Sequence, residues 1–378
     1  MLRLFRRYGL HLLLFCLTVL TTTLAGAEWI TGRLFFVNEQ HLGWSEWMTW
    51  AHFKKGLAFS IPFLTFLTVH EFGHYFTARW HKVRVTLPYY IPLWLGITAT
   101  IGTAGAFIRI KSPLQSRTQL FDIGVAGPLA GFVVAFGVLV YGFWSLPEPE
   151  YIFDIHPEYA AYGLDYAPHV YQDVEGLKVG KSLLFMGLEW LLVRDPARMP
   201  NAYEIVHYPW LFAGYIGLLF TALNLMPIGQ LDGGHILYGM FGQEVHQKVA
   251  PVLFTVFVLY AGLGIITPYD DNESLLTAIP IYVAFLYLIA LRMFVERRNV
   301  LLWAMSVFTV QFLISFVSPT TIGYAGWLLY AFLLGRVLGI YHPPAIQDAP
   351  LSPARKALGW LSLVIFILCF SPRPFMIG

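Results

Sequence analysis

Two histidines and a glutamate occur together in the pentapeptide His70-Glu71-Phe72-Gly73-His74. Residues i and i+4 of a helix share a face, so His70 and His74 can direct two imidazole nitrogens at one tetrahedral zinc ion. Glu71 projects beside them, where it can accept the proton of an attacking water as a general base. Gly73 leaves room on the same turn for a substrate backbone or a packed helix. The pentapeptide therefore predicts zinc-assisted hydrolysis with one Zn²⁺ per chain.

The pentapeptide lies within an apolar run that extends from Leu57 to Phe76. Two imidazoles and a carboxylate in hydrocarbon cost several kcal/mol unless a metal or another partner satisfies them. The alternative is a pair of packed histidines with Glu71 hydrogen-bonded between helices. The position of the motif inside an apolar segment favours the metal site over this alternative.

A catalytic zinc needs a third protein ligand and an open fourth position. The sequence offers Asp232, which follows an apolar run that begins at Trp210. Pro227 and Gly229 break the helix before it and can turn its carboxylate toward the metal. The alternative is an ordinary loop aspartate in a glycine-rich turn. The HExxH motif earlier in the chain favours the ligand role.

These side chains must be positioned by membrane helices, because the composition excludes a soluble protein. Of the 378 residues, 57% are hydrophobic and 12% are charged, whereas about a quarter of the residues of soluble domains are charged. The net charge of +2 comes without a basic patch, so we expect no nucleic-acid partner. Cys16 and Cys369 lie in apolar runs and predict neither a disulfide framework nor a thiolate metal site. We predict an all-α polytopic integral membrane protein in contact with the lipid bilayer.

The apolar segments give the expected organisation of the chain. Segment 89–107 is rich in proline and glycine, and we interpret it as a re-entrant extended or β element shielded by protein. Segment 182–193 is too short to span and is expected at the interface. We predict three parts: an N-terminal anchor and external segment (1–56), a core with an external loop at 145–208 (57–240), and additional C-terminal helices (241–378). The apolar segments are 9–26, 57–78, 89–107, 121–144, 209–228, 249–267, 275–291, 299–317, 322–340 and 357–370.

The first apolar segment follows Arg3, Arg6 and Arg7. A cleaved signal peptide is one interpretation, and an uncleaved anchor with a cytoplasmic N-terminus is the one that we favour. With that orientation most of the 24 Lys and Arg fall on the cytoplasmic side, as the positive-inside rule requires. This orientation places the site nearer the cytoplasmic face, and from the architecture we predict a bacterial inner membrane protein. His207, His246 and His342 lie near predicted boundaries, where solvated or capping roles are expected rather than metal binding.

The HExxH motif followed by Leu-Asp-Gly at the end of a later span resembles the site-2 protease family of intramembrane zinc metalloproteases. Their second motif reads Asn-Pro-x-Pro-x-x-x-Leu-Asp-Gly, and this chain has Leu225 in place of the first proline, as in the plastid and cyanobacterial branch. Gly127-Pro128-Leu129-Ala130-Gly131 is similar to the family's glycine-rich core motif, whose small residues allow close helix packing. The resemblance covers about residues 57–240. The matching residues of the second motif are Asn224, Pro227, Leu231, Asp232 and Gly233.

The resemblance implies a core of three helices with the active site between the first and third, and cleavage of a transmembrane protein substrate. A helical peptide hides its carbonyls, so the substrate must unwind. Segment 102–111 could supply a strand edge for it, or could simply seal the site. Asn224 could hold a substrate carbonyl or an oxyanion, or could be a packing hydrogen bond. Segment 145–208 is too short for a PDZ domain, so the chain looks most like the branch without one.

A metal-binding transporter and a non-catalytic membrane chaperone are the competing functions. A transporter would be expected to carry ionisable residues along several spans, whereas here they are concentrated at one point. An inactive relative would most simply have lost Glu71, which is present. The sequence leaves open whether the chain forms a homo-oligomer. It also leaves open the identity of the substrate, the cleavage site and the trigger.

Overall fold

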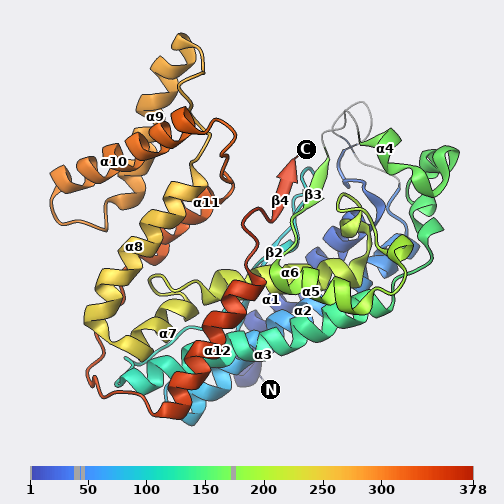
Figure 1. Ribbon diagram of the computed structural model, residues 1–378. Helices are drawn as coiled ribbons and strands as arrows, with labels where there is room; N and C mark the ends of the chain where they lie inside the picture. Colours follow the sequence, from blue (N-terminus) through green and yellow to red (C-terminus); the bar gives the residue numbers. More distant parts are fainter. Residues whose placement is uncertain (1, 38–42, 44–46, 172–175, 378) are drawn as a thin grey trace. The chain divides into compact units, whose positions relative to one another are not determined.

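The computed structural model describes residues 2–37, 43, 47–171 and 176–377 (Figure 1). They form two compact units. The first comprises residues 1–113, 126–223 and 364–378, and the second comprises residues 114–125 and 224–363.

The first unit begins with two long helices, α1 (Leu2–Thr31) and α2 (Trp50–Trp80). Thr49 starts α2 with a capping box that it shares with His52. The two helices lie against each other at a small residue, since a Cβ on Gly56 would stand 2.1 Å from the carbonyl oxygen of Thr23. The hydroxyls of Thr22 and Ser60 share a hydrogen bond of 2.6 Å across the same contact.

A short antiparallel sheet follows α2, formed by β1 (Tyr89–Leu93) and β2 (Gly102–Phe107). Its register pairs Tyr89 with Phe107 and Leu93 with Gly102. Gly102 has a φ of +81°, and a Cβ there would lie 2.3 Å from the Cα of Thr22 on α1, so only glycine fits. The extended element predicted for segment 89–107 is therefore present as a small sheet packed on α1.

The rest of the first unit consists of α3 (Arg117–Trp144), which begins in the second unit, an irregular segment, and α6 (Pro209–Leu225). The C-terminal strand β4 (Phe375–Ile377) pairs antiparallel with β3 (Leu177–Val179) of the irregular segment. The hydroxyl of Tyr215 donates to the carbonyls of Gly180 and Pro374 beside this pair. The remaining elements of the segment are η1 (Pro149–Asp154), η2 (Pro157–Asp165), α4 (Ala167–Val170), α5 (Leu183–Leu192), η3 (Pro196–Arg198) and η4 (Ile205–His207).

The second unit holds α7 (Asp232–Phe241), α8 (Gln243–Ala261), α9 (Asn272–Ala290) and α10 (Arg297–Val317). In the predicted span 322–340 a helix begins only at α11 (Trp327–Phe332) and ends in a π-helical turn, η5 (Leu333–Leu338). This segment is therefore shorter than the sequence predicted. Arg355 of α12 (Pro353–Cys369) donates twice to Asp122, at 2.7 and 2.8 Å.

Within the described residues, five helices are long and apolar enough to cross a membrane. They are Tyr8–Thr31 of α1, and the whole of α2, α3, α9 and α10. Helices α5 and α6 are apolar but shorter. The prediction of a mainly helical, polytopic membrane protein with a small β element is confirmed.

Candidate metal centre

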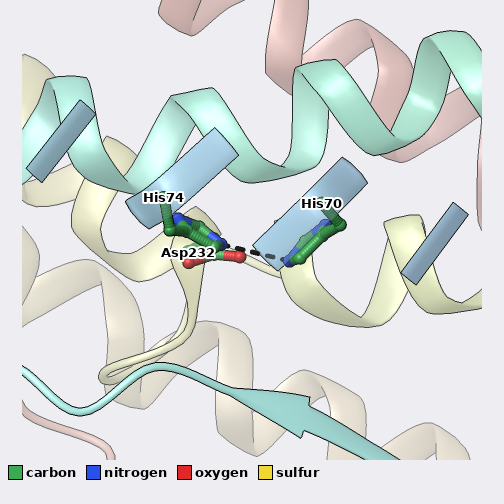
Figure 2. Close-up of side chains that lie close together, drawn as sticks. All are labelled: His70, His74 and Asp232. Carbon is green, nitrogen blue, oxygen red and sulfur yellow. Dashed lines mark hydrogen bonds between the residues drawn. The ribbon is translucent and has the colours of Figure 1, made fainter. Parts of the chain in front are cut away.

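His70 and His74, the HExxH pair, lie on the same face of α2, as their spacing in the sequence predicts. Both are buried, and so is Glu71 between them. The Nε2 atoms of the two histidines are 3.1 Å apart, drawn as a dashed line in Figure 2. The two rings are nearly perpendicular, at 76°. Two ring nitrogens are therefore aimed at one point in a buried part of a membrane-length helix.

This separation fits a shared zinc ion. Two nitrogens bound to one tetrahedral zinc at about 2.0–2.1 Å lie about 3.3 Å from each other, close to the 3.1 Å between His70 and His74. Neutral imidazole is a preferred zinc ligand, and a carboxylate follows directly in the sequence at Glu71. The donor set and its geometry match the zinc-binding role that the pentapeptide predicted.

The glycine-rich stretch of α3 makes room for the HExxH pair. A Cβ on Gly127 would lie 2.1 Å from Nε2 of His74, and a Cβ on Gly131 would lie 3.0 Å from Cβ of His70. The two glycines are four residues apart, so they present one face of α3 to the two histidines on one face of α2. Pro128 stands between them within the same helix. The two glycines of this stretch therefore allow the backbone of α3 to pack closely against the two imidazoles.

Gly73 belongs to the same contact between α2 and α3. A Cβ on Gly73 would lie 2.7 Å from the carbonyl oxygen of Ala126. The sequence left two uses for this glycine, room for a substrate backbone or room for a packed helix. The structure shows α3 packed against Gly73, and this close approach of the two helices sets the position of the imidazoles along α3.

The second unit carries the second motif at the start of α7. Leu231 is extended and precedes the helix, and Asp232 is its first residue. Gly229 has a φ of +62°, a conformation that glycine adopts without strain. The turn is tight, because a Cβ on Gly233 would lie 2.0 Å from the carbonyl oxygen of Leu225. The helix break predicted at Pro227 and Gly229 therefore lies between α6 and α7.

Asn224 lies in the last turn of α6 and is half-buried. His246 and His342, for which the sequence predicts solvated or capping roles, are buried in the second unit. His342 lies with its Nε2 2.7 Å from Nδ1 of His235, three residues after Asp232. The solvated role is therefore wrong for both residues, whose ring centroids lie 5.9 Å apart.

Within the first unit, and among the described residues, His156, Glu204 and His207 form a group that could hold a metal ion, with one ligand atom from each lying within 4.8 Å of the others. Asp232 belongs to the second unit, where it is the first residue of α7, and its role as a zinc ligand stays a prediction.

These features define a class of protein, a polytopic membrane protein with an HExxH metal centre inside a membrane-length helix. Residues 58–267 match the model of Peptidase family M50, and the chain belongs to that family. The resemblance to site-2 proteases is confirmed.

Two of the curated relatives of this chain are plant proteins. The chain is 29% identical over 218 residues to a protein of Oryza sativa subsp. indica named probable zinc metalloprotease EGY2, chloroplastic. The matched region covers 58% of this chain and 34% of the relative. It is 33% identical over 187 residues to a protein of Arabidopsis thaliana named probable zinc metalloprotease EGY1, chloroplastic. The matched region covers 48% of this chain and 29% of the relative. The chain thus spans about a third of the length of these relatives. No solved structure matches it.

Proposed function

We propose that this chain is an intramembrane zinc metalloprotease that hydrolyses a peptide bond in or next to a transmembrane helix of a membrane protein. The observation that carries the proposal is the buried HExxH pair, with its Nε2 atoms 3.1 Å apart and Glu71 beside them on a membrane-length helix. Membership of Peptidase family M50 and the names of the relatives support it.

Asp232 is the proposed third ligand. Its support comes from its place in the second motif, between Leu231 and Gly233, and from the tight turn that presents it as the first residue of α7. A three-ligand set of two histidines and one carboxylate leaves the fourth position open, as catalytic zinc sites require.

The residues of the chain divide the chemistry among them. When bound, zinc would lower the pKa of a water molecule and polarise the peptide carbonyl. Glu71 takes the proton from the attacking water and passes it to the departing amine. Asn224 is proposed to donate to the carbonyl oxygen as negative charge develops on it. Close packing against Gly127 and Gly131 holds the two imidazoles in place.

The substrate must reach the site as an extended chain, because helical carbonyls are already hydrogen-bonded. The sheet of β1 and β2 is proposed to receive it by strand addition. The strands carry partly exposed apolar side chains at Ile91, Leu93 and Phe107, which suit a partner drawn from a transmembrane helix. The proposed partners are therefore a transmembrane protein substrate and the lipids around it.

The proposal includes the orientation, with the N-terminus on the side that carries most Lys and Arg. The more specific prediction of a bacterial inner membrane has no support from the relatives, which are named as chloroplast proteins.

The test is cleavage of a single-span helical substrate by the purified chain in detergent. Wild type, Glu71→Gln and wild type with a chelator are compared side by side. Cleavage by wild type alone supports the proposal. Cleavage that survives Glu71→Gln contradicts the role of Glu71, and stoichiometric zinc without cleavage of any substrate in a panel favours the transporter or the chaperone.

A further inference from the structure

The irregular segment between α3 and α6 contains a second cluster of histidines and a carboxylate within the first unit. His156, Glu204 and His207, which we name the loop triad, turn their side chains toward one point. Nε2 of His156 lies 3.4 Å from Nε2 of His207. Oε2 of Glu204 lies 3.7 Å from the first of these nitrogens and 3.3 Å from the second.

The local backbone explains two members of the loop triad. Glu204 and His207 are three residues apart around the short 3₁₀ turn η4, whose three residues per turn place such side chains on the same side. His156 comes from the other end of the segment, directly before η2. The cluster therefore closes the segment on itself.

The three distances suit a single bound ion. The ligand atoms of a tetrahedral zinc with bonds of about 2.0–2.1 Å are about 3.3 Å apart, and the loop triad has separations of 3.3, 3.4 and 3.7 Å. Two imidazole nitrogens and one carboxylate oxygen make a common zinc ligand set with a fourth position left open.

Burial makes the loop triad costly without an ion. The side chain of Glu204 is only 3% exposed and that of His207 only 7%. Within the described part of the chain, Oε2 of Glu204 has no hydrogen-bond partner. A buried carboxylate oxygen without a hydrogen bond loses the full solvation of that oxygen. A cation at the centre would satisfy it.

The other polar atoms of the loop triad are already engaged, as in the outer shell of a metal site. Nδ1 of His207 lies 2.6 Å from the carbonyl oxygen of Trp29, in the last turn of α1. Oε1 of Glu204 accepts hydrogen bonds from the hydroxyls of Tyr171 and Tyr159. When Nδ1 of His207 donates to the carbonyl, the lone pair of Nε2 points at the centre.

We propose that His156, Glu204 and His207 bind a second transition-metal ion of the zinc class, separate from the HExxH pair. This ion fastens both ends of the α3–α6 segment to each other and, through the bond from His207 to Trp29, to the end of α1. The sequence predicts a solvated or capping role for His207. The solvated role is wrong, since the residue is buried, whereas the capping contact with α1 is present.

The experiment counts metal in the purified full-length chain after loading with Zn²⁺ and removal of the excess. The background variant His70→Ala/His74→Ala removes the HExxH pair. We expect this variant to retain one zinc per chain and to lose it when His156→Ala and His207→Ala are added. His169→Ala is the matched control, because His169 lies exposed in the same segment and stacks on Tyr162.

A spectroscopic arm requires no change to the loop triad and so does not depend on whether its variants fold. Co²⁺ added to His70→Ala/His74→Ala should give the visible absorption of a tetrahedral site with nitrogen and oxygen ligands. No bound zinc and no such spectrum in this background overturn the proposal. Metal retained after loss of His156 and His207 also overturns it. Neither result bears on cleavage by the HExxH pair, so the two proposals can fail independently.

Discussion

The HExxH pair and the loop triad each bring two histidines together next to a glutamate, but they are assembled in different ways. The HExxH pair lies on one continuous helix, where a spacing of four residues brings the imidazoles together. The loop triad joins residues 51 positions apart through a segment of short 3₁₀ turns and loops. Helical spacing makes a metal site visible in a sequence, whereas a site made by loop closure depends on contacts that no local pattern records.

The surroundings of the two clusters also differ. Glycines of α3 leave space for the imidazoles of the HExxH pair, so the helix contact sets their position. The loop triad is held by individual hydrogen bonds, from Tyr171 to Glu204 and between His207 and the carbonyl of Trp29. We therefore expect chemistry at the first cluster and a fastening role at the second.

Among the substitutions at the two clusters, Glu71→Gln should have the largest effect on the cleavage rate. The amide cannot take a proton, so cleavage should fall by about 10²- to 10⁴-fold, the usual contribution of a general base. The zinc content should not change, because Glu71 is not a proposed ligand. The measurement is initial cleavage rate together with metal content. Loss of metal in this variant would move Glu71 from base to ligand.

Asp232→Ala should weaken zinc binding by more than the 10- to 100-fold that loss of an outer-shell partner typically costs, because two imidazoles alone hold zinc poorly. Competition with a chelator of known affinity measures the change. Asp165→Ala is a suitable control, since Asp165 is exposed in η2. Unchanged zinc affinity in Asp232→Ala would remove this residue from the site.

Gly127→Ala should impair the HExxH pair without touching a ligand. The added methyl group would lie 2.1 Å from Nε2 of His74, so the ring must turn away and zinc affinity and cleavage should both fall. Gly137→Ala on the same helix is the matched control, because a Cβ there meets nothing within 4 Å. Equal behaviour of the two variants would show that α3 does not define the position of the imidazoles.

The smallest effect on cleavage is expected from His207→Ala. This change should remove the second ion and leave the HExxH pair intact. Saturating zinc, at about 100 times its dissociation constant, stabilises a folded site by about 2.7 kcal/mol. Zinc should therefore protect segment 145–208 from limited proteolysis in wild type and not in His207→Ala. Equal protection of both chains would contradict the fastening role.

The sequence predicted the parts that depend on local patterns. The apolar runs gave the membrane helices, the pentapeptide gave the buried pair on α2, and Pro227 with Gly229 gave the break before α7. The loop triad was missed because His156 and Glu204 meet only after the segment folds. The one local signal was Glu204 three residues before His207, a spacing that becomes meaningful only if a 3₁₀ turn is foreseen. The pairing of β3 with β4 was missed for the same reason.

That strand pair limits how the chain can be threaded through a bilayer. Val179 of β3 and Phe375 of β4 are backbone partners, so both must lie at the same level of the membrane. The chain between them must therefore cross the bilayer an even number of times, whichever helices make the crossings. Reporter fusions along residues 180–374 would count these crossings by their parity. The sequence places six apolar runs there, starting with 209–228. They meet the requirement if an even number of them cross the bilayer.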